Sequence, residues 1–468
     1  MSSTPRPRRP RMPPQVKFIV GNEACERFSY YGMSTIVVPF LVNNMHLPEN
    51  LAEYRYHLFV SGAYFMPLIG AFLADRFFGR YLVILVLSLA YVFGHGWIAA
   101  QPTLSGLTVG MFLIAIGAGG IKPNVSAFAG DQFDERESSL LERMYGYFYM
   151  AINVGSTISI FLTPWLLAKY GPDVAFGVPG VLMAMALIIF WLGRKTYRRA
   201  PPTGPNPNGF FRVLAYAVSH QRERKHGQRF LDVARVRFPD EAVEGVRAVW
   251  GITKVFALCT IWWGLWNQQS STWVVQASHM DLTVFGYTFQ AAQIQDLNAI
   301  FVVAGIPLLS RGPYRWSERA GVKPTPVRRM KVGMFLMVPA FACAALIEHA
   351  IAAGQTPSCV WQVPQFLLLS ISEILISATA LEFAYKQAPK SMKSIIMGIW
   401  FLTISLGNLM TAFVTKLNPF SGPTFYWFFA ILMTIAAFLF LLITAGFREK
   451  DLELVGEAAP REPSASPP

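Results

Sequence analysis

Apolar stretches recur along the whole chain and are separated by short polar loops. About 20 mainly apolar residues are enough to cross the hydrocarbon core of a bilayer as an α-helix. Hydropathy and the positions of turn-forming residues predict twelve such spans. They lie near residues 16–42, 55–75, 81–100, 106–126, 145–168, 174–193, 250–277, 285–310, 330–352, 360–385, 392–415 and 423–446. The pattern therefore predicts an all-α integral membrane protein with twelve transmembrane helices.

A polar segment over residues 194–249 divides these spans into two groups of six. It begins with the breaker-rich stretch APPTGPNPNG, and its later part, FLDVARVRFPDEAVEGVRAVW, alternates apolar and charged residues at helical spacing. We expect the later part to form a cytoplasmic amphipathic helix; a disordered tether is the alternative. The predicted divisions are a basic cytoplasmic N-terminus (1–15), a first six-helix bundle (16–193), the linker (194–249), a second six-helix bundle (250–447) and a disordered cytoplasmic tail (448–468).

The distribution of charge supports this topology and argues against a nucleic-acid partner. Only 14% of the residues are charged, against about 25% in soluble domains. Lys and Arg gather at 5–11, 76–80, 194–199, 222–237, 311–331 and 386–393, and at Arg448 and Lys450. The alternate loops carry only a few, such as Arg55, Lys169 and Lys416. This asymmetry predicts a multi-pass protein of the cell's inner (plasma) membrane with both termini in the cytoplasm, and it explains the net charge of +13.

Three charged residues lie inside the first predicted span: Glu23, Glu26 and Arg27. A charge near the bilayer centre costs about 2.5–3.5 kcal/mol on insertion scales, so three in one helix require interior partners or a water-filled cavity. Their i, i+3, i+4 spacing places them on one helical face. We therefore expect them to face the interior of a bundle and to belong to a transport or proton pathway.

The sequence lacks the patterns of a membrane-embedded enzyme, which is an alternative from another functional class. The four cysteines, Cys25, Cys259, Cys343 and Cys359, show no metal-ligand spacing. The chain has no nucleophile elbow, glycine-rich nucleotide loop or histidine cluster. We therefore expect no catalytic activity, no cofactor and no bound metal.

The segment GAFLADRFFGRY (70–81) resembles the loop between spans two and three in the major facilitator superfamily. In such a loop, Gly70 would permit the close approach of two helices. Asp75, Arg76 and Arg80 would form a charge network at the cytoplasmic face and help to hold one conformation together. The resemblance implies the major facilitator fold, with two six-helix bundles.

Further motifs make the resemblance more specific. They are ERFSYYG after Glu23, GGIKPNVSAFAGDQF (119–133), FYMAINVGS (148–156), WNQQSSTWVVQAS (266–278) and SEILISATALEFAYKQAPKSMKSIIMGIWFLTISLGN (372–408). In this order they resemble the proton-coupled oligopeptide transporter family over nearly the whole chain. The resemblance implies symport of di- and tripeptides with protons, by rocking of the two halves around a cavity near the midplane of the membrane.

The charged motif residues suit a zwitterionic peptide. Arg27 and Lys122, from the first half, would hold its carboxylate, and Glu373, from the second half, would hold its amine. Neutral hydrogen bonds and side-chain pockets would come from Asn153, Asn298, Tyr30, Tyr64, Trp263 and Trp400. Three alternatives remain at this point: Lys122 forms a structural ion pair with Glu373, Arg27 only neutralises Glu23 or Glu26, and the tryptophans only pack between helices.

Proton coupling is expected to involve the same charges. If a peptide carboxylate takes Arg27 or Lys122, an acid that was paired with that cation loses its partner and binds a proton more readily. We expect Glu23, Glu26 and Glu373 to gain and lose protons during the cycle. His57, with an ordinary pKa of about 6.5, would suit an external proton acceptor; a histidine hydrogen-bonded at the membrane interface is the alternative.

Several positions depart from the family pattern. Ser34 and Asn267 stand where relatives commonly carry an Arg and an acid, so we expect that an ion pair between the halves is absent here. Asp296 stands where a small polar residue is usual and is a candidate replacement acid. The turn at 354–360 is too short for the large extracellular domain of animal relatives, which points to a bacterial member.

Other functions remain open on the sequence alone. One alternative is a proton-coupled facilitator for another small zwitterion or anion, such as an amino acid or nitrate. A passive channel is another. The intact Glu23-x-x-Glu26-Arg27 motif favours peptides. We expect the partners to be small peptides, protons and the lipid bilayer, and the protein to be a monomer.

Overall fold

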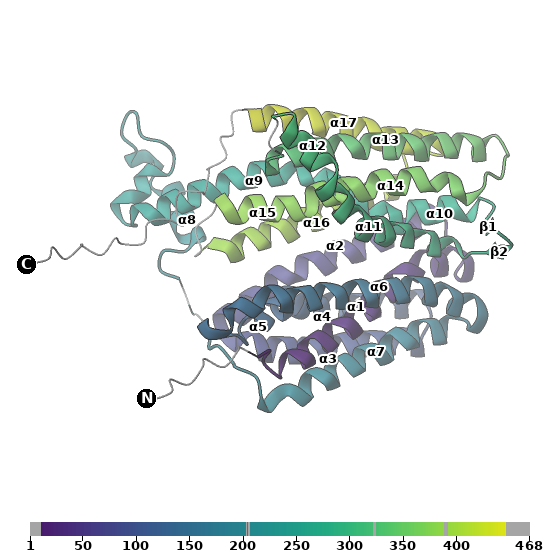
Figure 1. Cartoon of the computed structure of the whole chain (residues 1–468), viewed down its shortest axis with the longest axis horizontal. Helices are drawn as coiled ribbons and strands as arrows, with labels where there is room; N and C mark the ends of the chain where they lie inside the picture. The colour runs from purple at the N-terminus through teal and green to yellow at the C-terminus, as the bar shows by residue number, and fades with distance from the viewer. Residues whose placement is uncertain (1–10, 203, 205, 322–323, 388–391, 446–468) are drawn as a thin grey trace, which may run out of the picture.

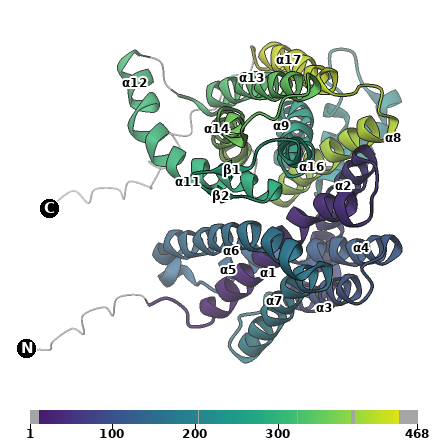
Figure 2. The same cartoon turned by 90° about the vertical axis from the view of Figure 1, so that its right-hand side faces the viewer.

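Two bundles of helices lie side by side in the computed structural model (Figures 1 and 2). The structure describes residues 11–202, 204, 206–321, 324–387 and 392–445. The predicted disordered tail, most of the basic N-terminus and part of the basic cluster at 386–393 lie outside the described residues. Each bundle has its own buried apolar core, the first around Met33, Tyr91 and Phe176 and the second around Phe256, Phe341 and Phe429.

The first half contains seven α-helices. They are α1 (Val16–Pro39), α2 (Glu49–Leu73), α3 (Gly79–Ala100), α4 (Leu104–Ile121), α5 (Asn124–Gly130), α6 (Leu141–Tyr170) and α7 (Pro172–Leu192). Single π-helical turns extend α1 (Phe40–Asn44) and α2 (Ala74–Phe78), and short 3₁₀ turns occur at Glu135–Leu140 and Gly193–Lys195.

The second half follows a linker that contains α8 (Phe210–Ser219) and two 3₁₀ turns (Gln221–Glu223 and Asp232–Val236). Its helices are α9 (Asp240–Trp266), α10 (Thr272–Ser278), α11 (Asp296–Arg311), α12 (Pro313–Arg319), α13 (Pro326–Ala352), α14 (Gln362–Glu373), α15 (Thr379–Gln387), α16 (Lys393–Leu417) and α17 (Pro423–Ala445). A small hairpin pairs β1 (Thr283–Val284) with β2 (Tyr287–Thr288), and further irregular turns lie at Asn267–Ser270, Ala291–Gln295, Cys359–Trp361 and Ile374–Ala378.

The described helices account for the twelve predicted spans. Ten segments are long and apolar enough to cross a membrane, and one of them, Glu49–Ala100, contains both α2 and α3. The two helices separate at Gly79, whose φ of 74° suits glycine. The remaining span is α1, which carries the charges at 23, 26 and 27. The prediction of an all-α membrane protein with twelve spans is confirmed.

Three spans are interrupted within their length. α4 gives way to α5 at Lys122–Pro123, α9 to α10 at the 3₁₀ turn Asn267–Ser270, and α14 to α15 at the π-helical turn Ile374–Ala378. Proline removes a backbone donor at the first of these breaks, and π-helical turns often accompany functional sites. Two candidate residues, Lys122 and Glu373, stand immediately before a break.

The linker prediction was wrong in its position. The amphipathic helix is α8, which buries Phe210, Val213 and Ala217 on one face. The segment at 230–250 is not one helix, because a 3₁₀ turn occupies Asp232–Val236 and α9 begins separately at Asp240, after its N-cap Pro239. Span seven was predicted from 250. Pro239 followed by two acids is a helix-start signal that was present in the sequence.

Two further boundaries differ from the prediction. Span eight was predicted from 285, but the β hairpin and a 3₁₀ turn occupy that region and α11 begins at Asp296. The signature segment at 70–81 is mostly helical, because α2 continues through the π-helical turn Ala74–Phe78. A window of apolar residues cannot distinguish these short irregular elements from a helix.

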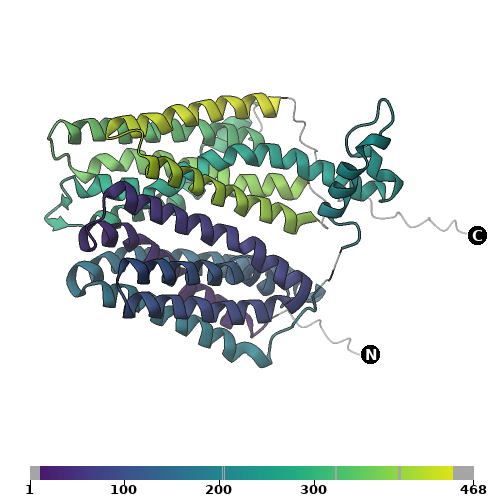
Figure 3. The ribbon, with the colours of Figure 1, turned by 180° about the vertical axis from the view of Figure 1, so that it is seen from behind.

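Polar contacts between the halves lie from the middle of the molecule towards one end. We call this the loop end, because it holds residues 45–48 and 279–290; the other end, with residues 194–239, is the linker end (Figure 3). The contacts join His57 to Asn408 (2.9 Å) and Ser271 (2.8 Å), Ser61 to Ser405 (3.1 Å), Gln293 to the Phe161 carbonyl (2.7 Å), Asn50 to the Thr415 carbonyl (3.4 Å) and Glu49 to His279 (3.2 Å). The halves are therefore hydrogen-bonded near the loop end.

The expected role of Gly70 in close helix packing leads to a first prediction. A Cβ atom on Gly70 would lie 1.9 Å from the carbonyl oxygen of Gly119, so a side chain there forces α2 away from α4. Gly70→Val should destabilise the purified protein by about 1–3 kcal/mol and lower its melting temperature in detergent. Gly96→Ala is the matched control, because nothing lies within 4 Å of a Cβ at that position. Equal melting temperatures for the two variants would contradict the packing argument.

The ion pair between Glu49 and His279 leads to a second prediction. The hydrogen bond that His279 donates to the Glu49 carboxylate raises the pKa of His279, which lies in the loop after α10. A raised folded-state pKa stabilises the protein below the unfolded value of about 6.5, and the effect is lost as the pH rises through the folded value. His279→Gln should therefore lower the melting temperature slightly at about pH 5.5 and leave it unchanged at about pH 8.5. A difference that grows at high pH would contradict this assignment.

Candidate functional site

The guanidinium of Arg27 contacts both acids of its helix. Its Nε lies 3.0 Å from Oε1 of Glu23 and 2.6 Å from Oε2 of Glu26. All three residues are buried. The predicted common face is confirmed, and Arg27 does neutralise these acids, as one alternative proposed. Two carboxylates share one guanidinium, so the group has a formal net charge of −1 when both acids are ionised.

The two acids differ in their surroundings. Glu26 is fully buried, and its carboxylate forms no hydrogen bond to the described residues. Its polar neighbour on α3 is the buried Tyr91, whose hydroxyl faces the same carboxylate. His95, one turn further along α3, contacts Ser29 at 2.8 Å. The sequence analysis missed Tyr91 and His95, because only the tertiary structure brings these side chains of α3 close to those of α1.

Lys122 lies between two aromatic rings. Its Nζ is 3.7 Å from the ring centre of Tyr30 and 3.8 Å from that of Tyr64. The ammonium is buried and forms no hydrogen bond to the described residues. Cation–π attraction strengthens when the cation is removed from water, so the rings can stabilise this ammonium without an acid. Tyr30 and Tyr64 therefore enclose Lys122, which differs from the expected role as walls of a side-chain pocket.

Glu373 is the corresponding charge of the second half. Its Oε2 accepts hydrogen bonds from Nε1 of Trp266 at 2.9 Å and from Nδ2 of Asn298 at 2.8 Å. The predicted residue Asn298 thus lies at the site, and it also donates to Ser370 at 3.1 Å. The sequence analysis did not single out Trp266 as a site residue, although it is the first residue of the WNQQSSTWVVQAS motif (266–278).

The alternative of an ion pair between Lys122 and Glu373 is wrong for this conformation. Ion pairs among the described residues join neither Arg27 nor Lys122 to Glu373. Tyr31 nevertheless lies near enough to both Arg27 and Glu373 for each charge to act on its hydroxyl. Each charge is stabilised inside its own half and keeps capacity for an additional partner.

The two predicted tryptophans pack against each other. The ring centres of Trp263 and Trp400 are 5.6 Å apart at a steep angle, and Trp400 also contacts Phe256 at 4.8 Å. Both are buried, which agrees with packing between α9 and α16. The indole nitrogen of Trp263 has no hydrogen-bond partner among the described residues, so it remains available to a ligand. Asn153 donates to the Tyr149 carbonyl of its own helix at 2.8 Å.

His57 is fully buried and joins the two halves. Its Nδ1 lies 2.9 Å from Oδ1 of Asn408, and its Nε2 lies 2.8 Å from Oγ of Ser271. Both ring nitrogens are therefore occupied by neutral partners of the second half. This geometry favours the hydrogen-bonded alternative over an external proton acceptor in the present conformation.

The charge network near the linker end is formed by partly different residues from those expected. Nη1 of Arg80 donates to both carboxylate oxygens of Asp131, at 2.8 Å and 2.6 Å. Nη2 of Arg80 lies 3.7 Å from Oδ1 of Asp75. Arg76 contacts the ring of Phe77 at 5.9 Å and takes part in none of the ion pairs found among the described residues. The partner that the sequence analysis missed is Asp131, at the end of the GGIKPNVSAFAGDQF motif.

At the positions that depart from the family pattern, the polar side chains either form a hydrogen bond within their own segment or leave an atom without a partner among the described residues. Ser34 donates to the Tyr31 carbonyl at 3.2 Å, and Asn267 donates to the Trp263 carbonyl at 3.0 Å. Among the hydrogen bonds of the described residues, none joins these two side chains to each other. Asp296 is buried, and its Oδ1 has no hydrogen-bond partner among the described residues. Its role as a replacement acid stays a prediction.

The comparison with known families identifies the chain. The PTR2 model, described as the POT family, matches residues 81–427, which is well over half of the sequence. This chain belongs to the POT family. Solute carrier family 15 member 2 of Homo sapiens is 38% identical over 72% of this chain, and Peptide transporter family 1 of Drosophila melanogaster is 38% identical over 72%. The chain matches about half the length of these curated relatives, at 49% and 48%.

Solved structures of this family share the fold. The POT family transporter PepTSo is 37% identical and superposes with a TM-score of 0.88 over 94% of this chain and 100% of that chain. An auto-inhibited POT family peptide transporter is 35% identical, with a TM-score of 0.87 over 93% of this chain and 98% of that chain. The predicted family and the two-bundle major facilitator fold are confirmed, and the chain is a multi-pass membrane protein of a transporter family. Its bacterial origin stays a prediction.

The Arg27 cluster leads to a third prediction. Removing the guanidinium leaves two buried acids without a cation, and breaking a buried ion pair costs about 3–5 kcal/mol. Arg27→Met should therefore lower the melting temperature strongly. Adding Glu23→Gln and Glu26→Gln to Arg27→Met should recover much of the loss, since no charge then lacks a partner. Arg55→Met, which alters a guanidinium at the surface, is the control. A small effect of Arg27→Met would contradict the assigned ion pairs.

Proposed function

We propose that this POT family member is a proton-coupled symporter that imports di- and tripeptides and peptide-like compounds by alternating access. The observation that carries the proposal is the arrangement of buried charges. Arg27 and Lys122 belong to the first half and Glu373 to the second, and no ion pair joins them across the halves. A ligand with a carboxylate and an ammonium can contact both halves at once.

The proposed ligand contacts follow from the hydrogen-bond donors and acceptors that each group does not use within the protein. Lys122 is held by two rings and retains its three N–H donors for a ligand carboxylate. Glu373 receives both of its hydrogen bonds on Oε2, which leaves Oε1 for the ligand ammonium. Trp263 can donate its indole N–H, and Asn153 can contribute its side-chain oxygen. Recognition of the two ends tolerates different side chains, as a transporter of many peptides requires.

Proton coupling would run through the shared guanidinium. Glu23 and Glu26 depend on Arg27 for their negative charge, because a buried carboxylate without a cation is unfavourable. When a peptide carboxylate recruits Arg27, one of the acids takes up a proton instead. Each proton that moves inward across 100 mV supplies about 2.3 kcal/mol, enough for roughly fifty-fold accumulation. His57 stays a possible second proton site in a conformation where its partners separate.

The conformational part of the proposal rests on the contacts between the halves. They are neutral hydrogen bonds and one exposed ion pair, located from the middle of the molecule towards the loop end. Such contacts are individually weak, so a ligand that prefers one state can change the balance. From the positive-inside distribution we infer that the linker end and both termini face the cytoplasm. A monomer in the inner membrane is part of the same proposal. On that orientation, the present conformation is closed towards the outside.

Names of relatives support the same substrate class. Proteins 35–38% identical to this chain are described as peptide transporters. The intact Glu23-x-x-Glu26-Arg27 sequence also agrees with peptide transport. An amino acid or nitrate as the main substrate is the alternative.

The proposal is tested by uptake into liposomes that contain the purified protein. An imposed inward proton gradient should drive accumulation of labelled dialanine, and trialanine should compete, whereas free alanine and nitrate should not. Competition by nitrate or alanine at equal concentration, with none by trialanine, would favour the alternative substrates. Uptake that does not saturate would indicate a channel.

A fourth prediction separates coupling from binding. Glu23→Gln and Glu26→Gln should each abolish accumulation driven by the proton gradient, since the acid can no longer exchange a proton. Counterflow of dialanine should survive, because substrate exchange needs no net proton movement. Glu142→Gln, a change of an exposed acid in the first turn of α6, is the matched control. Uphill, pH-driven uptake by the Glu23 and Glu26 variants would defeat this part of the proposal.

A further inference from the structure

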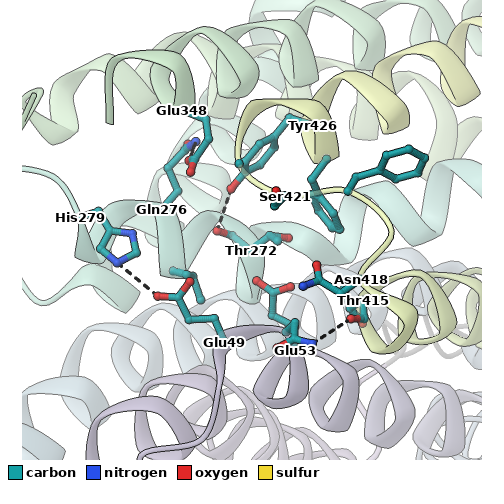
Figure 4. Close-up of a pocket in the computed structure, with 15 residues that line it drawn as sticks. Glu49, Glu53, Thr272, Gln276, His279, Glu348, Thr415, Asn418, Ser421 and Tyr426 are labelled. Atoms are coloured by element: carbon teal, nitrogen blue, oxygen red, sulfur yellow. Dashed lines mark hydrogen bonds and ion pairs between the residues drawn. The ribbon is translucent and has the colours of Figure 1, made fainter. Parts of the chain in front are cut away.

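A polar cavity lies between the two halves at the loop end, and its lining includes none of Arg27, Lys122 and Glu373 (Figure 4). Its volume is about 250 Å³, far larger than the ~30 Å³ that one water occupies in the liquid. α2 contributes Glu49, Asn50 and Glu53 to its lining. The second half contributes residues of α10, α13, α16 and α17, among them Gln276, Glu348 and Tyr426.

The three carboxylates that line this cavity differ in their hydrogen-bond and ion-pair partners. Glu49 pairs with His279 at 3.2 Å, and Glu348 accepts a hydrogen bond from Nε2 of Gln276 at 2.9 Å. Glu53 is only 5% exposed and lines the cavity, and among the described residues it forms neither a hydrogen bond nor an ion pair. An ionised carboxylate that is buried without a partner is costly, so this side chain either carries a proton or is stabilised by a cation in the cavity.

The walls of the cavity determine the charge of that group. The lining contains three acids and no Lys or Arg, and His279 at the rim is already engaged by Glu49. Glu49 and Glu53 come from the first half and Glu348 from the second, so closure at the loop end brings like charges together. A cation in the cavity would relieve this repulsion.

We propose that the cavity binds the primary ammonium group of a small organic amine, with Glu53 as its charged partner. The N–H donors of the ammonium would point to Glu53 and to the neutral oxygens of the lining. The aromatic residues Phe420, Phe425 and Tyr426 would contact its carbon chain and supply cation–π attraction. This site is separate from Arg27, Lys122 and Glu373 and does not depend on peptide transport.

A metal ion fits the same cavity less well. Among the residues that the structure describes, no three His, Cys, Asp or Glu side chains converge in a way that would hold a metal. Hard cations require about six or more oxygen ligands at short distances, whereas an ammonium needs only a few directed hydrogen bonds. The apolar side of the lining would also leave part of a compact ion's shell unsatisfied.

Occupancy should influence the conformational balance. The ligand would contact Glu53 on α2 and, across the cavity, residues of the second half, so it binds only while the halves are together at this end. A ligand with that preference stabilises the present conformation. Small amines would therefore act as modulators of the proposed transport cycle from a site other than the substrate site.

The test uses the full-length protein in detergent at about pH 7, with butylammonium chloride as the probe. Tetramethylammonium chloride, which lacks N–H donors, and sodium chloride are compared at the same concentration. Butylammonium should raise the melting temperature in a saturable manner, and the other two salts should not. Equal shifts from sodium or tetramethylammonium would overturn the assignment of a primary-ammonium site.

Variants then locate the binding site. Glu53→Gln should weaken butylammonium binding, measured by calorimetry, at least about tenfold, because a charge-assisted hydrogen bond is lost. Glu142→Gln, at an exposed position of α6, should bind as the unmodified protein does. If Glu53→Gln does not fold, Glu348→Gln should still show a severalfold loss. Unchanged affinity in a folded Glu53 or Glu348 variant would overturn the proposal, whatever the outcome of the dialanine uptake experiment.

Discussion

The structure depends on one constraint: a charge buried in the hydrocarbon region must find its stabilising partner within the protein. Arg27 satisfies this requirement with Glu23 and Glu26 of its own helix, at 3.0 and 2.6 Å. Lys122 satisfies it with the faces of two tyrosine rings, and Glu373 with the N–H groups of Trp266 and Asn298. In every case the partner belongs to the same half. The halves can therefore separate without leaving these charges unpartnered.

Because each half stabilises its own buried charges, the contacts between the halves can be weak. The bonds of His57 to Asn408 and Ser271, and that of Ser61 to Ser405, join neutral groups. Hydrogen bonds of this kind exchange readily with water at small net cost. A cross-half pair between Lys122 and Glu373 would instead have held the two bundles together by a buried ion pair, which costs several kcal/mol to break. Neutral Ser34 and Asn267 fit the same arrangement, since neither position carries a charge across the interface.

Breaks in the helices place the charged side chains. Lys122 precedes Pro123 at the junction of α4 and α5, and Glu373 precedes the π-helical turn between α14 and α15. Trp266 ends α9 immediately before a 3₁₀ turn. Irregular backbone inside a membrane is tolerated where neighbouring protein or a polar cavity satisfies its polar groups. The same local departures that direct these side chains inward made the helix boundaries hard to predict.

Periodicity and hydropathy in the sequence alone determined the membrane class, the twelve spans and the inward face of α1, because each depends on residues within a single stretch of about 20 positions. The motifs also singled out Lys122 and Glu373, which the structure places beside helix breaks in the first and second halves; their role as site residues stays a prediction. Tertiary structure decided the partners: Asp131 rather than Arg76 in the Arg80 network, Trp266 on Glu373, and two tyrosines around Lys122. It also decided that His57 joins the halves. These contacts depend on which faces of distant helices meet, and no short window of sequence contains that information.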